Sequence, residues 1–367
     1  ELSHWNPENA FESEESFSYY EKELKEILRM LANHPSFVML TFGNELHALQ
    51  KGHERMDELL KKARKWDSTR LYANGSNVHY GNRGCDAGSD FYTSSNYYEK
   101  ELRGTFAGMK GYINHSYPNA MTDFEETMTH LRGSFAKPVF SFEVGQFEVL
   151  PDFDELEDFQ GISEPANIRW IKKRVEEMGL LPVWKKYVEA TGELSKICYR
   201  EEIEAALRTR QLSGISLLGL QDFPGQGTAL VGMLNSHLRP KPFPFARPES
   251  FREFFTGQRP LVLLPKYTYE NTESLMAEVR VANYGKSVVE GKLCYCLEGK
   301  DIRMEKRPGR VSCPVGELTD VGVLDFSLTD ITASMKLELT VSVKVSDDKR
   351  ISASYPIWVY PPVKPIC

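Results

Sequence analysis

The chain lacks the features that mark several large protein classes. None of its apolar runs approaches the roughly 18 residues that a membrane-spanning helix needs. The formal net charge is −7, which argues against a nucleic-acid partner, because that partner favours a basic face. No internal repeat is visible. The first residue is Glu1 rather than Met, so the lack of a visible signal peptide leaves the localisation undetermined.

Cysteine is also scarce, with six residues in the 367-residue chain. Cys294 and Cys296 are two positions apart on a predicted strand, so they face the same side and would not readily bridge each other. No CxxC pair and no Cys/His cluster at zinc spacing occurs. We therefore expect free, mostly buried thiols, no metal site and no cofactor.

What the chain does contain is a pair of carboxylates at the ends of apolar, strand-like runs. Glu45 ends the run over residues 36–45, and Glu143 lies near the end of the run over residues 137–145. A carboxylate at the carboxyl end of a parallel barrel strand points into the mouth of the barrel, where active sites are built. Glycoside hydrolysis uses two such carboxylates, one as the acid and the other as the nucleophile or base.

Residues 1–236 alternate helix-like and strand-like segments. This alternation predicts a parallel sheet covered by helices, which is an α/β fold. About five strands can be counted, whereas a closed (β/α)8 TIM barrel needs eight, so the first strands would precede residue 1. We predict helices over residues 13–33, 55–66, 124–132 and 166–210, the last interrupted near Gly179 and Gly192, and strands over residues 36–45, 70–73, 90–95, 138–143 and 213–221.

Proline marks a break after this region. Four prolines fall between Pro240 and Pro248, and because proline donates to neither helix nor sheet, we predict a stiff linker over residues 237–258. Residues 259–367 then show short segments with a period of two, clearest over 337–345. This pattern predicts an antiparallel, immunoglobulin-like β-sandwich.

Further polar and aromatic side chains follow the predicted strands. Each has a structural alternative, in a core or at a polar strand end, that the sequence leaves open. Asn44 would bond a sugar hydroxyl, and one phenol of Tyr97 and Tyr98 would hydrogen-bond the nucleophile and hold its orientation. The remaining candidates for the substrate pocket are His4, Trp5, Gln221 and Asp222.

Several of these segments resemble glycoside hydrolase family 2, which includes β-galactosidases, β-glucuronidases and β-mannosidases. Residues 34–39 leading into Gly43-Asn44-Glu45 resemble its acid/base motif. Residues 67–70 and 73–76 resemble the segment leading into its fifth strand, and residues 137–143 the strand with its nucleophile. Tyr97 falls near a tyrosine that members place after strand six. Residues 220–223 depart from the pattern, because many members have a Trp there.

The resemblance implies a retaining mechanism in a (β/α)8 barrel, with Glu45 as acid/base and Glu143 as nucleophile. It also implies that the chain begins near the end of strand three and is a piece of a longer protein. We expect a retaining exo-β-glycosidase acting on an oligosaccharide or glycoside. A catalytically inactive carbohydrate-binding protein on the same scaffold is the main alternative, and a structural or adhesion module is a third. The sugar, the linkage and homo-oligomerisation stay open.

Overall fold

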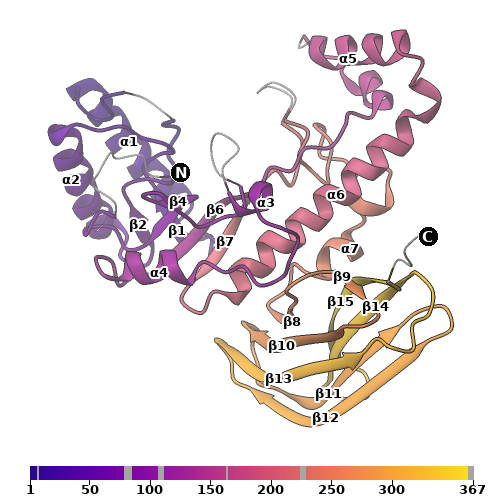
Figure 1. Cartoon of the computed structure of the whole chain (residues 1–367). Coiled ribbons are helices and arrows are strands. Elements are labelled where there is room, and N and C mark those ends of the chain that lie inside the picture. The colour runs from indigo at the N-terminus through magenta and orange to yellow at the C-terminus, as the bar shows by residue number, and fades with distance from the viewer. Residues whose placement is uncertain (6–7, 78–84, 106–110, 163, 224–228, 363–367) are drawn as a thin grey trace. The chain divides into compact units, whose positions relative to one another are not determined.

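The computed structural model describes residues 1–5, 8–77, 85–105, 111–162, 164–223 and 229–362 (Figure 1). The chain divides into two compact units. Unit 1 comprises Glu1–Gly108, Phe124–Val144 and Gln211–Leu218, and unit 2 comprises Met109–Asp123, Gly145–Arg210 and Gly219–Cys367. The domain bounds predicted from the sequence stay a prediction.

Unit 1 alternates short strands with helices, as the sequence predicts. β1 pairs in parallel with β2, and β3 pairs in parallel with β6, which β7 flanks. The elements are α1 (Glu14–Met30), β1 (Met39–Thr41), α2 (Gln50–Trp66), β2 (Leu71–Ala73), β3 (Tyr92–Ser94), β4 (Asn96–Tyr97), β5 (Lys100–Glu101), α4 (Glu125–Arg132), β6 (Val139–Gly145) and β7 (Gly214–Leu218).

Backbone hydrogen bonds join these short strands into one series. Leu2 N donates to Thr41 O over 3.0 Å, which places the N-terminal segment beside β1. Asp90 N donates to Tyr72 O over 2.8 Å, which places β3 beside β2. The resulting order is the N-terminal segment, β1, β2, β3, β6 and β7, each helix following a strand. This arrangement is TIM-barrel-like, and closure into a full barrel stays a prediction.

Helix α1 shows why the predicted helices form. Ser13 Oγ accepts a hydrogen bond from Ser16 N, which satisfies one of the free donors at the first turn. Phe17, Leu24 and Leu28 recur at helical spacing and are buried in the same core as Leu59 and Leu60 of α2.

In unit 2 the predicted interruption of the long helix near Gly179 is confirmed, and the one near Gly192 is wrong. α5 (Ala166–Glu177) ends at the turn that contains Gly179, and α6 (Leu181–Arg208) continues through Gly192. A Cβ at Gly192 would lie 2.0 Å from the Phe245 ring. Gly192 therefore leaves room for the Phe245 ring to pack against α6, and the helix continues through this position.

The proline-rich stretch contains two short helices and a buried ring, and its role as a linker stays a prediction. η3 (Pro244–Ala246) is a turn of 3-10 helix, and the short helix α7 (Pro248–Arg252) follows it. Phe245 is fully buried and stacks on Phe243. Unit 2 also contains α3 (Tyr112–His115) and η2 (Phe153–Asp158).

The C-terminal region of unit 2 is rich in β-structure. A three-stranded sheet has the order β13-β10-β8, and a five-stranded sheet has the order β12-β11-β14-β15-β9. The strands are β8 (Gln258–Leu263), β9 (Thr268–Glu270), β10 (Ser274–Asn283), β11 (Val289–Glu298), β12 (Arg303–Cys313), β13 (Glu317–Ser327), β14 (Met335–Lys344) and β15 (Arg350–Tyr360).

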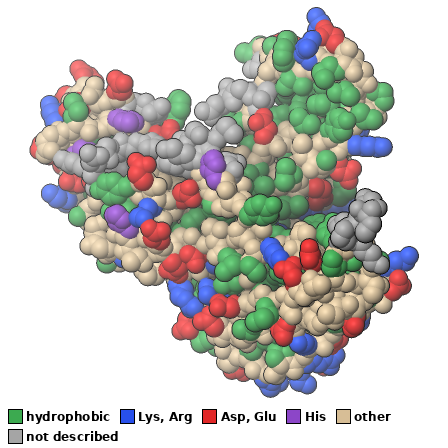
Figure 2. All heavy atoms as spheres, viewed as in Figure 1, with side chains coloured by type: hydrophobic (Ala, Val, Ile, Leu, Met, Phe, Trp, Pro, Cys, Tyr) green, Lys and Arg blue, Asp and Glu red, His purple; other side chains and the backbone are tan. Residues whose placement is uncertain are grey.

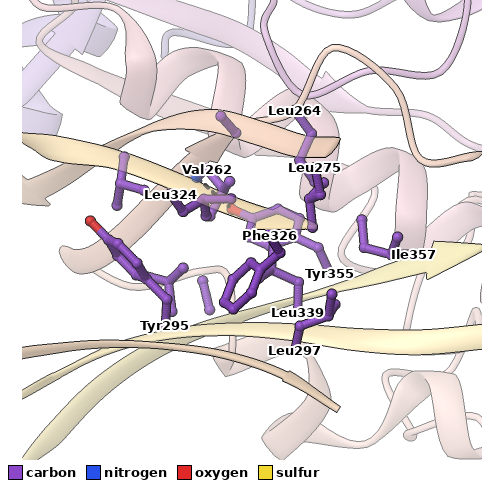
Figure 3. Packing of buried hydrophobic residues seen from close by; sticks show 14 of the residues in the cluster. Val262, Leu264, Leu275, Tyr295, Leu297, Leu324, Phe326, Leu339, Tyr355 and Ile357 are labelled. Carbon is purple, nitrogen blue, oxygen red and sulfur yellow. Dashed lines mark hydrogen bonds between the residues drawn. The ribbon is translucent and has the colours of Figure 1, made fainter. Parts of the chain in front are cut away.

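One hydrophobic core is shared by these two sheets. Val262 and Phe326 of the three-stranded sheet belong to the same cluster as Leu297, Leu339 and Tyr355 of the five-stranded sheet, and Figure 3 shows their side chains directed toward one another. Alternate residues of β10, β11 and β15 supply this core, as the period of two predicts. An immunoglobulin-like topology stays a prediction.

Candidate active site

Glu45, which lies four residues after β1, and Glu143, which lies in β6 two residues before its end, share an unusual backbone conformation. Their φ angles are 55° and 57°, in the left-handed region that non-glycine residues seldom occupy. Such strain costs on the order of 1 kcal/mol or more and gathers at functional sites. Just before Glu45, Gly43 has φ 148°, and a Cβ there would lie 2.3 Å from the His4 carbonyl oxygen. The glycine allows the chain to turn and present Glu45.

The two carboxylates meet at a single amide, that of Asn77. Its Nδ2 donates to Glu45 Oε1 over 3.2 Å and to Glu143 Oε2 over 2.8 Å. Its Oδ1 accepts from Ser95 N and Ser95 Oγ. Since the first two bonds are 3.2 and 2.8 Å long, those carboxylate oxygens lie no more than about 6 Å apart. The carboxylates therefore converge within unit 1.

Arg103 is the cationic partner of Glu143. Its Nη1 lies 3.2 Å from Glu143 Oε2 and 2.6 Å from the Glu143 carbonyl oxygen. Burial raises the pKa of Glu143, the charge of Arg103 opposes this rise, and the charge of Glu45 adds to it. Arg103 and Asn77 both favour the ionised carboxylate, whereas the low-polarity surroundings disfavour it.

Two predicted binding residues lie beside Glu45. The indole Nε1 of Trp5 donates to Glu45 Oε2 over 3.2 Å, and the Trp5 side chain is 64% exposed, so its ring face is available to a ligand. Asn44 accepts a bond from Ser76 Oγ through its side-chain oxygen, and its backbone N donates to the His4 carbonyl. These contacts fix both residues next to the candidate acid/base.

His4 and Tyr97 both have buried rings, as in the structural alternative that the sequence leaves open. The His4 ring is buried, stacked on Tyr20 at 4.1 Å between centroids, and burial lowers its pKa to about 4. Tyr97 is buried as well, and its hydroxyl pairs with Ser134 Oγ over 2.8 Å. Asn77 and Arg103 contact the Glu143 carboxylate, and a contact of a Tyr97 or Tyr98 phenol with the nucleophile stays a prediction.

Gln221 and Asp222 belong to unit 2. Asp222 is 2% exposed, and its Oδ1 accepts from Lys241 Nζ over 2.8 Å and from Gly232 N over 2.9 Å. These partners occupy the carboxylate in a buried ion pair, which argues for a structural role. Gln221 is exposed and forms a bridge with Leu234. Its place in a substrate pocket stays a prediction.

Sequence reasoning missed Asn77 and Arg103. Asn77 directly follows the 73–76 segment that resembles the family's fifth strand, so continuing that segment by one residue would have found it. Arg103 follows the short strand β5, and no motif marks it. In the part of the chain that the structure describes, no group of three or more His, Cys, Asp or Glu side chains could hold a metal ion. In the same residues, no helix is both long and apolar enough to cross a membrane.

A TIM-barrel-like unit with converging carboxylates defines a glycoside hydrolase-like scaffold. Residues 5–162 match the family described as glycosyl hydrolases family 2, TIM barrel domain. The predicted resemblance to glycoside hydrolase family 2 is thereby confirmed for this part of the chain. Residues 273–361 match a family described only as a domain of unknown function. No curated protein matches the chain.

Solved glycosidase structures are similar at low identity. The chain is 12% identical to the exo-chitosanase CsxA of Amycolatopsis orientalis, with a TM-score of 0.49, covering 94% of this chain and 39% of that one. It is 12% identical to β-glucuronidase 2 of Bacteroides uniformis, with a TM-score of 0.40, covering 95% and 37%. The chain thus spans well under half the length of either enzyme.

Proposed function

We propose that the chain contributes the two catalytic carboxylates of a retaining exo-β-glycosidase. One observation carries the proposal: Glu45, after β1, and Glu143, in β6, both accept a hydrogen bond from the side-chain nitrogen of Asn77. Retaining enzymes hold their carboxyl groups about 5–5.5 Å apart, and inverting enzymes about 6.5–9.5 Å apart. Glu45 Oε1 and Glu143 Oε2 lie no more than about 6 Å apart, and this upper limit supports the retaining class.

In the proposed reaction, Glu143 attacks the anomeric carbon and forms a covalent glycosyl-enzyme. Glu45 protonates the departing glycosidic oxygen and then takes a proton from the water that releases the sugar. The nucleophile must be ionised, and the donors Asn77 and Arg103 favour that state. The exposed ring of Trp5 would stack on the substrate, with the indole N–H holding Glu45 in place.

Substitution of the nucleophile tests the proposal. In the full-length protein, Glu143→Gln should abolish turnover of aryl β-glycosides and leave sugar binding intact, because the amide keeps the shape and loses the nucleophile. Glu148→Gln is the matched control, since Glu148 lies five residues away and is exposed. Full turnover by Glu143→Gln would refute the assignment.

Chemical rescue tests the second carboxylate. Glu45→Ala should lose turnover, and azide should restore part of it on substrates with activated leaving groups. Those substrates need no acid for the first step, and azide replaces the water that Glu45 would activate. Azide that fails to form a glycosyl azide product would contradict the acid/base role.

The alternative, a carbohydrate-binding protein without activity, is favoured by one observation. Burial raises the pKa of Glu143, and a protonated carboxyl group is a poor nucleophile. A screen of aryl glycosides across pH separates the two functions. Turnover that appears as Glu143 ionises supports the enzyme, and sugar binding without turnover at any pH supports the alternative.

For the C-terminal region we propose the immunoglobulin-like sandwich that the sequence predicts. The two sheets share one core, and the antiparallel neighbours β10 and β13 lie in one sheet while β11 and β14 lie in the other. A chain whose successive strands pass from one sheet to the other and back is typical of such sandwiches.

A further inference from the structure

Four cationic residues lie in register across the outer face of the five-stranded sheet. Arg310 of β12 is opposite Lys292 of β11, Lys292 is opposite Lys344 of β14, and Lys344 is opposite Arg350 of β15. All four are exposed. Neighbouring strands are about 4.8 Å apart, so this cationic row runs about 14 Å across the sheet, perpendicular to the strands. Figure 2 shows Lys and Arg side chains gathered along the lower margin, where Figure 1 places β11 and β12.

The cationic row has no evident stabilising role. Like charges directly opposite each other on neighbouring strands destabilise a sheet. Among the described residues, the carboxylate that pairs with the row is that of Asp347, which lies 2.7 Å from Lys344 Nζ and is highly exposed. Its charge is mostly screened by water. The row is therefore better explained by an external anion than by folding.

The cationic row borders a groove of about 580 Å³ on the same face. The groove also contains Glu298 and Glu305, and the ion pairs with Arg303 and Arg307 offset both acids. The cationic row therefore leaves the groove with a net positive charge. Thr340 adds a hydroxyl group, which suits a hydroxylated ligand.

We propose that this groove binds a linear acidic polysaccharide, whose repeated carboxylate or sulfate groups pair with the cationic row. A chain with regularly spaced anions is complementary to cations that recur at every strand. The groove's described lining holds no aromatic side chain for stacking on bases, which disfavours a single-stranded nucleic acid. The choice of a polysaccharide among polyanions rests on the proposed function.

Binding of defined polymers to the full chain tests the proposal. Isothermal titration should detect polygalacturonate and dextran sulfate at low salt and little binding of neutral dextran. High salt should weaken binding, because exposed charges are screened. The double variant Lys292→Gln/Lys344→Gln should bind about tenfold more weakly or worse, since it removes two of the four charges of the cationic row.

The control Lys61→Gln/Lys65→Gln removes the same charge from exposed positions of α2 and should bind normally. The thermal midpoint of the Lys292/Lys344 variant should be unchanged or higher, because repulsion is relieved. Glu143→Gln should retain polymer binding, so this test is separate from that of the glycosidase. Unchanged binding by the Lys292/Lys344 variant, equal binding of neutral dextran, or tighter binding of duplex DNA would each overturn the proposal.

Discussion

The side-chain nitrogen of Asn77 lies 2.8 Å from Glu143 Oε2 and holds that carboxylate beside Glu45. The amide cannot easily rotate, because its oxygen accepts two hydrogen bonds from Ser95. A fixed donor stabilises negative charge on its acceptor without reorganisation. Asn77 is therefore a candidate positioning residue for the proposed nucleophile.

Replacing Asn77 should reduce activity and shift its pH dependence. We expect Asn77→Ala to lower kcat about 10²-fold, the effect of losing one fixed donor. The acidic limb of the kcat/KM profile should move to higher pH, because the ionised form of Glu143 loses a hydrogen bond. Asn77→Asp should move it further, since a negative charge would face both carboxylates. A pH profile like that of the wild type in both variants would exclude this role.

Removing the Tyr97 hydroxyl should leave catalysis nearly unchanged. That hydroxyl pairs with Ser134 and the ring is buried, so Tyr97→Phe should reduce stability by about 1 kcal/mol, the contribution of one hydrogen bond. Aryl glycoside kinetics and chemical denaturation check the two effects. A large fall in kcat with normal stability would place Tyr97 in the reaction after all.

Unit 1 should lose stability in acid because of His4. Burial lowers the pKa of His4 from about 6.5 to about 4, so the folded state binds fewer protons than the unfolded state between these values. Stability should therefore be full above about pH 6.5 and fall by on the order of 1 kcal/mol as the pH drops to 4. His4→Phe keeps the stacking on Tyr20 and should abolish this loss, as denaturant titrations at pH 4.5 and 7 would measure. An equal acid loss in the variant would assign the effect to other groups.

Glu155 should make the stability of unit 2 fall as the pH rises, which is the opposite of the effect of His4 in unit 1. Burial, followed by the charge of Asp222, raises the pKa of Glu155 from 4.5 to about 7, and Lys241 opposes the rise. Between these values the folded state binds more protons than the unfolded state, so stability falls as the pH rises. The loss should be on the order of 1 kcal/mol.

Glu155→Gln mimics the protonated acid and should remove this dependence of stability on pH. The difference between the thermal midpoints at pH 5 and pH 8 measures the dependence. Exposed Glu157 of the same 3-10 helix provides the control Glu157→Gln, whose pH dependence should match that of the wild type. If Glu155→Gln retains the full dependence, the buried carboxyl group is not its source.

The local pattern predicts the secondary structure well where burial repeats with the period of the element. α1 and β14 follow the spacing of their apolar residues, because each has one face in a core. The pattern fails at Gly192, where the helix continues. The ring that needs the space, Phe245, is 53 residues away in the sequence, and no local rule couples the two positions.

The amino-acid sequence by itself determined that Glu45 and Glu143 accompany strand-forming runs, and with them the family resemblance of residues 5–162. Only the tertiary structure decided which groups surround those carboxylates. Asn77 reaches Glu143 across 66 positions and Arg103 reaches it across 40. Hydrogen bonds depend on ångström-scale distances that arise when separate strands pair, and a linear pattern of residue types does not specify them.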